Sequence, residues 1–159
     1  MVALDSDRGR LARVRQNLDR LGLSGPQVKL LCADAAQVSS WWDGKPFDAI
    51  LADVPCTASG VVRRHPDIRW LRRPEDIDKT ATLQRTIIDA LWSTLKVGGH
   101  MLYATCSIFP QEGEEQVGAF LQRHSDARRM PAPGQLLPLA EPGLPAGDGF
   151  FYALFVKRG

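Results

Sequence analysis

The stretch FDAILAD at residues 47–53 joins a short apolar run to an acidic residue, and this pattern decides the fold. Continuous apolar runs of this length predict strands that are buried on both faces of a parallel sheet. The pattern occurs twice before it: the strand predicted at residues 2–4 ends in Asp5, and the strand predicted at residues 28–32 ends near Asp34. The chain therefore has three predicted strands that each lead into an acid.

Helices are predicted between the strands. Apolar residues at helical spacing run from Leu11 to Leu21, and a second series from Ile77 to Leu95 is expected to stop at Gly98-Gly99. The remaining predicted elements are a strand at residues 100–104, a helix at 111–124, a loop at 131–147 and a last strand at 150–156. This alternation predicts an α/β fold with helices on both faces of a doubly wound, mainly parallel sheet, in one domain over residues 1–159.

Composition favours a cytoplasmic protein with reduced cysteines. Hydrophobic residues make up 44% of the chain, no apolar run is long enough to cross a bilayer, and the first residues do not form a basic and apolar leader. Cys32, Cys56 and Cys106 show neither paired spacing nor a metal-ligand spacing with the histidines, so we expect no disulfide, no metal and no membrane contact. The net charge of +2 does not by itself indicate a polyanion partner.

The acids at the strand ends are candidates for a binding site. Ligands of open α/β sheets bind outside the carboxyl ends of the strands, so we expect Asp5, Asp34, Asp53 and Cys106 to converge on one edge of the sheet. An alternative stays open for each acid taken singly, because Asp is also a favoured residue at the start of a helix.

Two longer motifs carry a resemblance to a known family. The strings DVPCTASGVVRRHPDIRWLRRPEDI at residues 53–77 and YATCSIFPQEGEEQ at residues 103–116 are similar to the signature motifs of the Sun/Fmu (RsmB-like) family of bacterial 16S rRNA cytosine-5 methyltransferases. The likeness extends to ALDSDRGRLARVRQNLDRLGL near the start and to DGFFYALFVKR near the end. It implies a Rossmann-like methyltransferase fold, S-adenosylmethionine as cofactor and small-subunit rRNA as partner.

The resemblance also implies roles for single residues. Cys106 matches the catalytic nucleophile, and Cys56 matches the second cysteine, which assists product release. Asp5, Asp34 and Asp53 match acids that contact S-adenosylmethionine, and Asp53 is also close to the target base. In this scheme Asp5 accepts the ribose hydroxyls and Asp34 meets the adenine amine.

The reaction explains why a thiolate is needed. Carbon 5 of cytosine is a poor nucleophile until a thiolate adds to carbon 6, and Cys106 is the candidate for that thiolate. A free thiol has a pKa of about 8.5, so positive charge nearby would help, and Arg63, Arg64 and His65 are the nearest basic candidates. By residue type alone, a buried strand cysteine would be the favoured interpretation of Cys106, and the surrounding TCS and FP residues reverse that preference. Cys32 is expected to serve only in packing.

An arginine-rich segment lies within the motif at residues 53–77. Its basic and aromatic residues suit phosphate contacts and base stacking, so we interpret it as an RNA-facing loop. The alternative is a solvated turn whose charges are balanced by neighbouring acids. The residues proposed to contact RNA are Arg63, Arg64, His65, Arg69 and Trp70, with Arg72 and Arg73 in the same cluster.

The family's first motif, a glycine-rich turn after the first strand, is not found in the sequence, so the fold is expected to be incomplete at its amino terminus. We expect this to leave the strands at residues 2–4 and 47–52 each with an unpaired edge, and the isolated chain to bind S-adenosylmethionine weakly and turn over little. The sequence also differs from the family at four positions. These are Val54, Thr57, Ser59 and Gly113, where the family commonly has Ala, Ser, Thr and Asn.

Three other functions remain open. The chain could be a catalytically silent RNA-binding fragment that uses the arginine-rich loop. It could be a DNA cytosine-5 methyltransferase, in which Cys56 would be the nucleophile. A nucleotide-dependent dehydrogenase fits the fold class, but no glycine fingerprint supports it.

Overall fold

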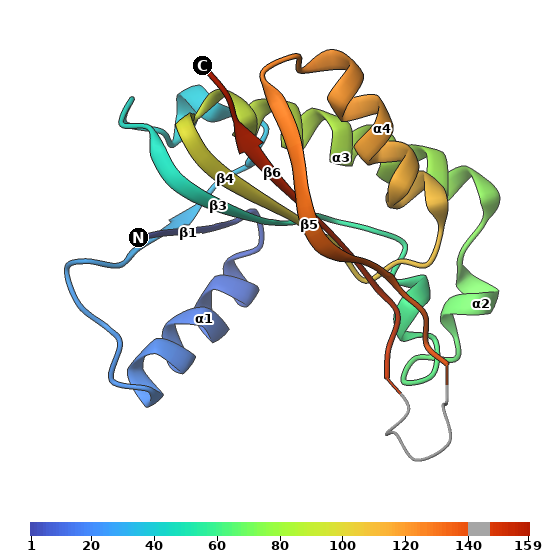
Figure 1. Cartoon of the computed structure of the whole chain (residues 1–159). Helices are drawn as coiled ribbons and strands as arrows, with labels where there is room; N and C mark the ends of the chain where they lie inside the picture. The colour runs from blue at the N-terminus through green and yellow to red at the C-terminus, as the bar shows by residue number, and fades with distance from the viewer. Residues whose placement is uncertain (140–146) are drawn as a thin grey trace. The chain divides into compact units, whose positions relative to one another are not determined.

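The computed structural model describes residues 1–139 and 147–159 of the chain (Figure 1). The chain divides into two compact units, Met1–Lys45 and Pro46–Gly159, each with its own sheet. The α/β class predicted from the sequence is confirmed, since each unit contains both strands and helices, although the larger sheet is mixed and not mainly parallel. That residues 1–159 act as one domain stays a prediction.

The first unit is a β-α-β segment. Strands β1 (Val2–Asp5) and β2 (Lys29–Cys32) pair in parallel, with Asp5 opposite Cys32. Helix α1 (Arg8–Arg20) connects them and begins after Asp7, whose carboxylate accepts hydrogen bonds from the first backbone N–H groups of the helix. A single 3-10 turn, η1 (Val38–Ser40), follows β2. The carboxyl ends of β1 and β2 therefore lie side by side.

The second unit holds a four-stranded mixed sheet in the order β3-β4-β6-β5. Strands β3 and β4 run in parallel, whereas β6 is antiparallel to both of its neighbours. The strands are β3 (Phe47–Asp53), β4 (Leu95–Thr105), β5 (Ala127–Leu136) and β6 (Phe150–Lys157). The helices are α2 (Ile68–Leu71), α3 (Pro74–Ser93) and α4 (Glu114–Arg123), with 3-10 turns η2 (Ser59–Val61) and η3 (Pro110–Glu112).

The core of the second unit lies between the sheet and the pair α3 and α4, which pack against each other and cover the same face (Figure 1). Phe120 on α4 is fully buried, with its ring 5.2 Å from Trp92 on α3 and 4.8 Å from Phe155 on β6. Along β6 the buried positions alternate, Phe151, Ala153 and Phe155, as expected for a strand with one face against a core. This packing anchors β6, and through its pairing with β6 also β4, beneath the two helices.

Two predictions about local structure are wrong. Helix α3 ends at Ser93, before the Gly98-Gly99 pair, and the glycines lie inside β4. Gly98 has a φ of +77° at the point where the β3–β4 register shifts, so the pair marks a bulge in the strand instead of a helix end.

The predicted loop at residues 131–147 is in part a strand. β5 extends to Leu136 and includes two prolines, Pro131 and Pro133. Proline removes a backbone donor and is tolerated at the edge of a sheet, and β5 is an edge strand whose register with β6 shifts between Met130 and Gly134. Residues 140–146 of the predicted loop lie outside the described residues.

Among the described strands, β1 and β3 each have one unpaired edge, as the sequence predicted. β1 and β3 each lie at an edge of their own sheet, and β3 pairs with β4 on one side only among the described strands. Leu51, in the middle of β3, is 69% exposed. A parallel strand of this apolar composition normally pairs on both sides, because unpaired backbone groups invite another strand.

The described residues also bear on membranes and metals. None of their helices combines the length and apolar character that a bilayer span needs. No group of three or more His, Cys, Asp or Glu side chains in the described part of the chain is arranged to hold a metal ion.

We predict that Phe120→Ala destabilises the second unit by about 3–5 kcal/mol, because the change leaves a cavity between Trp92 and Phe155. Urea unfolding followed by tryptophan fluorescence measures the loss. Leu83→Ala on the exposed side of α3 is the control and should change stability by only about 0.5 kcal/mol. Equal effects of the two changes would contradict the packing described here.

Candidate active site

The candidate site forms where β3 and β4 end. The two parallel strands place Asp53 opposite Ala104, and the ladder continues by a hydrogen bond of 3.2 Å from the Val54 N–H to the Ala104 carbonyl. Cys56 follows β3 by three residues, and Cys106 follows β4 directly. Parallel pairing therefore brings two cysteines that are 50 residues apart in sequence to one edge of the sheet.

The two thiols are in direct contact. The Sγ atoms of Cys56 and Cys106 lie 3.3 Å apart, and both side chains are half-buried. The hydrogen bond from the Cys56 thiol stabilises a thiolate on Cys106 and lowers the pKa of Cys106 to about 7. The same contact, together with burial, raises the pKa of Cys56 far above its ordinary value. At neutral pH, Cys56 therefore keeps its proton while Cys106 is partly ionised.

The source of this activation differs from the one predicted. Arg63, Arg64 and His65 were the basic candidates expected to favour the thiolate. The pKa of Cys106 is instead lowered first by Cys56 and then by its own backbone, while the charges of Asp53 and Glu112 act against it. A neighbouring neutral donor thus replaces the positive charge that sequence reasoning required.

A buried carboxylate joins the loops that carry the cysteines. Glu112 in η3 is 0% exposed and accepts five hydrogen bonds. Its Oε2 accepts from Thr57 Oγ1 at 2.5 Å and from Ser107 Oγ at 2.6 Å. Its Oε1 accepts from the Thr57 N–H at 2.9 Å, Thr80 Oγ1 at 2.7 Å and Gln84 Nε2 at 3.2 Å. The carboxylate therefore links both loops to α3.

The loop after Cys56 is held in an uncommon conformation. Ala58 has a φ of +60°, in the left-handed region that costs an L-residue roughly 1 kcal/mol. Gly60 then approaches the backbone closely: its N–H donates to the Cys106 carbonyl at 2.9 Å, and its carbonyl accepts from Gly149 at 2.8 Å. A Cβ at Gly60 would lie 2.0 Å from the Gly149 oxygen, so only glycine fits there. These contacts tie three segments of the chain together beside the cysteines.

The structure locates each acid that the sequence predicted for the site. Asp53 is exposed at the end of β3, and its charge raises the pKa of Cys106, so it lies within electrostatic reach of that thiol. Asp5 ends β1 in the first unit, where Arg10 binds both carboxylate oxygens at 2.7 and 2.8 Å and lowers the pKa of Asp5. Asp34 follows β2 and accepts a hydrogen bond from the Ala36 N–H at 2.9 Å. That Asp5 and Asp34 join Asp53 in one site stays a prediction.

The predicted RNA-facing residues lie in and before α2 on the surface of the second unit. Trp70 is 83% exposed, an unusual state for a tryptophan, and the other four residues are exposed as well. Arg64 forms an ion pair of 2.6 Å with Asp148. In the same segment Arg72 donates to the Thr57 carbonyl at 2.8 Å, which anchors the segment to the Cys56 loop.

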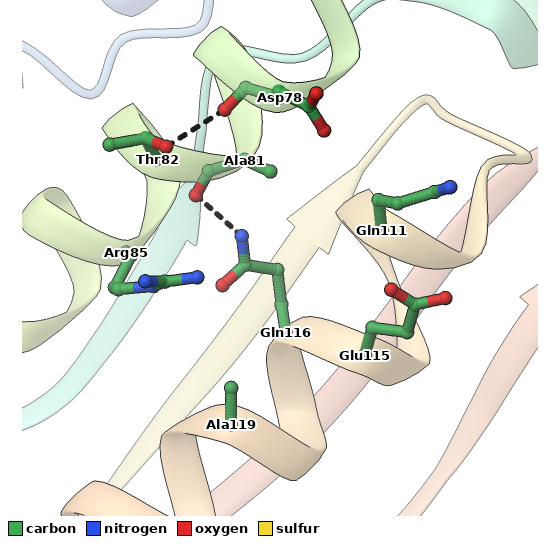
Figure 2. Close-up of a pocket in the computed structure, with 8 residues that line it drawn as sticks. All are labelled: Asp78, Ala81, Thr82, Arg85, Gln111, Glu115, Gln116 and Ala119. Carbon is green, nitrogen blue, oxygen red and sulfur yellow. Dashed lines mark hydrogen bonds between the residues drawn. The ribbon is translucent and has the colours of Figure 1, made fainter.

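A separate hollow of about 420 Å³ lies between α3 and α4 (Figure 2). Gln116 extends from α4 into this space and donates to the carbonyl of Ala81 on α3. Neither cysteine nor any residue predicted for the site contributes to its walls, so we place the chemistry at the strand ends. The residues that line the hollow are Asp78, Ala81, Thr82, Arg85, Gln111, Glu115, Gln116 and Ala119.

Some residues of the site were not identified from the sequence. Glu112 lies inside the second motif, and Gln84 and Tyr103 form a buried network with it: the Tyr103 hydroxyl lies 2.8 Å from the Glu112 carbonyl and 3.0 Å from Gln84 Oε1. A glutamate in a polar loop gives no sign of burial in the sequence. The prediction that Cys32 is a packing residue is wrong, because Cys32 is exposed at the end of β2.

Gly113, which differs from the residue common in the resembled family, is buried at the start of α4. A Cβ at this position would lie 3.1 Å from the ring of Phe151, which is itself fully buried on β6. The glycine therefore lets the Phe151 ring pack directly against the backbone beside Glu112.

Comparison with known proteins gives a consistent result. A family model described as 16S rRNA methyltransferase RsmB/F matches residues 1–156. Ribosomal RNA small subunit methyltransferase B of Vibrio cholerae is 52% identical over 159 residues, and its counterpart in Pseudomonas putida is 50% identical over 167 residues. Each match covers 99% of this chain but only 36% and 37% of the relative, respectively. The chain thus spans little more than a third of the length of these relatives.

Solved structures resemble the chain over nearly its whole length. The crystal structure of NSun6 from Pyrococcus horikoshii with SFG has a TM-score of 0.81 and 30% identity, covering 98% of this chain and 41% of that one. A methyltransferase homologue protein from the same organism has a TM-score of 0.77 and 30% identity, covering 98% and 52%.

We predict that alkylation of Cys106 by iodoacetamide rises with pH around a midpoint near 7, because the thiolate reacts and the thiol does not. Cys56→Ala removes the hydrogen-bond donor and should raise that midpoint by about one pH unit or more, toward the ordinary value of a free thiol. Peptide mass spectrometry after pulsed labelling follows each cysteine separately, with exposed Cys32 as internal reference. An unchanged midpoint in Cys56→Ala would contradict the hydrogen bond between the thiols.

Proposed function

The chain belongs to the 16S rRNA methyltransferase RsmB/F family, and on that premise we propose that it carries the catalytic cysteines of an S-adenosylmethionine-dependent rRNA cytosine-C5 methyltransferase. One observation supports the proposal above the others. Two thiols lie 3.3 Å apart at the ends of adjacent parallel strands, and their pKa values are shifted in opposite directions. Paired groups whose environments separate their pKa values are typical of acid–base partners.

Cys106 is the proposed nucleophile. Its thiolate adds to carbon 6 of the cytosine, which makes carbon 5 electron-rich enough to attack the methyl group of the sulfonium donor. With a pKa of about 7, Cys106 is ionised in a substantial fraction of molecules at neutral pH, yet it stays basic enough to be a strong nucleophile. The DNA-type alternative, with Cys56 as nucleophile, is disfavoured because the pKa of Cys56 is raised.

Asp53 is the proposed contact to the target base. Its carboxylate is exposed at the end of β3 and acts electrostatically on Cys106. A carboxylate there can hydrogen-bond cytosine near N3 and the exocyclic amine, which stabilises the protonated adduct as carbon 6 is attacked. Its own charge opposes the thiolate, so binding of a base that neutralises Asp53 would also favour ionisation of Cys106.

Cys56 is the proposed base of the second half of the reaction. While Cys106 is a thiolate, the hydrogen bond to it is the largest cause of the raised pKa of Cys56. Once the Cys106 sulfur is bonded to carbon 6 its negative charge is gone, so the pKa of Cys56 falls and the Cys56 proton can leave to solvent. The resulting Cys56 thiolate takes the proton from carbon 5, the carbon 5–carbon 6 double bond re-forms, and Cys106 leaves as a thiolate.

Asp5 and Asp34 are the proposed acceptors for S-adenosylmethionine, which supplies the methyl group. The carboxylates follow neighbouring parallel strands, the position at which α/β folds bind nucleotides. Arg10 holds Asp5 in one orientation while its oxygens keep acceptor capacity for ribose hydroxyls. These residues fit the polar end of an adenosine group, and their meeting with Asp53 stays part of the proposal.

Small-subunit rRNA is the proposed substrate, bound through Arg63, Arg64, His65, Arg69 and Trp70. The exposure of Trp70 favours this role, because an aromatic ring open to solvent can stack on an unpaired base. Arg72 connects the segment to Thr57, next to Cys56, so RNA contacts would be made beside the thiols. The same exposed segment supports the second candidate function, in which the chain binds RNA without catalysis.

The cytoplasmic location of the protein stays a prediction.

We predict that Cys106→Ser abolishes methyl transfer from labelled S-adenosylmethionine to a cytosine-containing small-subunit rRNA fragment. Cys56→Ser should instead accumulate a covalent protein–RNA adduct, because its proton acceptor is missing while the nucleophile remains. The assay uses the chain alone and the chain joined to the amino-terminal part of the Vibrio cholerae relative. We expect little turnover by the chain alone.

The adduct is detected by denaturing gel electrophoresis. Loss of the adduct in Cys56→Ser with its retention in Cys106→Ser would reverse the two roles. RNA binding without methyl transfer or adduct by either form of the wild-type protein would favour the silent RNA-binding fragment.

We predict that Trp70→Ala weakens binding of single-stranded RNA by about 1–3 kcal/mol, because the base no longer stacks on an indole ring. The double change of Arg63 and Arg69 to Ala should lower the slope of log affinity against log salt by roughly 0.7 for each phosphate that the variant no longer neutralises. Fluorescence anisotropy at several salt concentrations measures both. Arg15→Ala on exposed α1 removes a charge elsewhere and is the control. A slope that Arg15→Ala lowers as much would indicate unspecific charge attraction.

A further inference from the structure

Glu112 contacts the residue that follows each cysteine. Thr57, directly after Cys56, donates to it through both its backbone N–H and its hydroxyl. Ser107, directly after Cys106, donates to it through its hydroxyl. The two hydroxyl contacts, 2.5 and 2.6 Å long, end on the same oxygen and lie in the range of charge-assisted hydrogen bonds. A single atom thus joins the two loops next to the thiols.

The burial of Glu112 makes these contacts obligatory. A carboxylate removed from water costs several kcal/mol unless its lone pairs are satisfied. Its oxygens offer about four acceptor positions, and the five donors described above occupy them. The donors come from two loops and one helix, so any movement that separates the loops would leave part of a buried carboxylate unpaired.

Two roles of Glu112 are distinguished by the sign of its electrostatic effect on Cys106. One is a direct effect of the Glu112 charge on the thiolate, and the other is control of where the two loops lie. The charge of Glu112 raises the pKa of Cys106, so the field of the carboxylate opposes the thiolate. The hydrogen bond from Cys56 lowers that pKa, and the lowering prevails. If Glu112 assists the thiolate, it does so through the geometry of the Cys56–Cys106 contact.

We propose that Glu112 is a positioning residue that holds the Cys56 and Cys106 loops at the separation at which the two thiols form a hydrogen bond. Its relevance to catalysis rests on the function proposed above. The bonds from Thr57 and Ser107 to one carboxylate hold the two loops together, while the buried Gln84 and the part-buried Thr80 donate to the same carboxylate from α3.

The test compares three variants of the 159-residue chain that each weaken the same network. Glu112→Asp keeps the charge but is one methylene shorter, so it cannot reach both loops and α3 together. Ser107→Ala removes the bond on the Cys106 side, and Thr80→Val removes a bond of similar length on the α3 side. The readout is the pH midpoint of Cys106 alkylation, with urea unfolding as the measure of stability.

We expect Glu112→Asp and Ser107→Ala to raise the midpoint of Cys106 by about one pH unit, because the donor thiol moves away. Thr80→Val should destabilise the chain by a similar amount as Ser107→Ala and leave the midpoint near 7. Adding Cys56→Ala should raise the midpoint in the wild-type background but change it little in Ser107→Ala, since both changes remove the same hydrogen bond.

Two results would overturn the proposal. One is an unchanged midpoint in Ser107→Ala at a loss of stability equal to that of Thr80→Val, which would make Glu112 a purely structural group. The other is an equal shift in Thr80→Val, which would assign the effect to the surroundings of the carboxylate. Ser107→Ala keeps the test decisive if Glu112→Asp does not fold. Alkylation needs neither cofactor nor RNA, so failure here is distinct from failure of methyl transfer.

Discussion

The parallel pairing of β3 with β4 is the constraint on which the site depends. Because the register sets Asp53 opposite Ala104, both strands end at the same edge and release their loops side by side. The helices α3 and α4 pack on β6, the strand that pairs with β4 on its other side, through the Trp92, Phe120 and Phe155 cluster. Two thiols distant in the sequence can approach to 3.3 Å only because this register is held.

The polar groups at this edge divide into two layers. The outer layer is exposed or half-buried and consists of Asp53, Cys56 and Cys106, the groups with the chemistry proposed for cytosine methylation. The inner layer is a network around the buried side chains of Glu112, Gln84 and Tyr103. The inner layer supplies rigidity, because the Glu112 carboxylate loses hydrogen-bond partners if the loops move. The outer layer can then rely on a weak thiol–thiol hydrogen bond to set the reactivity of Cys106.

Errors in the sequence-based prediction arose where neighbouring strands decide local structure. Gly98-Gly99 looked like the end of a helix, but the pairing of β3 with β4 places the two glycines in a strand bulge. Pro131 and Pro133 looked like a loop, but an edge strand tolerates residues without a backbone donor. Cys32 looked like a core residue, but β2 has only one neighbour among the described strands and ends in solvent. In each case the residue type was compatible with two structures.

The sequence alone determined the α/β class, most strand and helix positions, the family and the two motifs that carry the cysteines, because apolar periodicity and motif spacing are local properties of a chain. Only the tertiary structure decided which side chain lowers the pKa of Cys106 and which side chains bind the carboxylate of Glu112. The pKa of Cys106 depends on a thiol 50 positions away and not on Arg63 and Arg64. The burial of Glu112 depends on donors from three separate segments. Such effects act over a few ångströms in space, and the sequence records no distances between residues that only folding brings together.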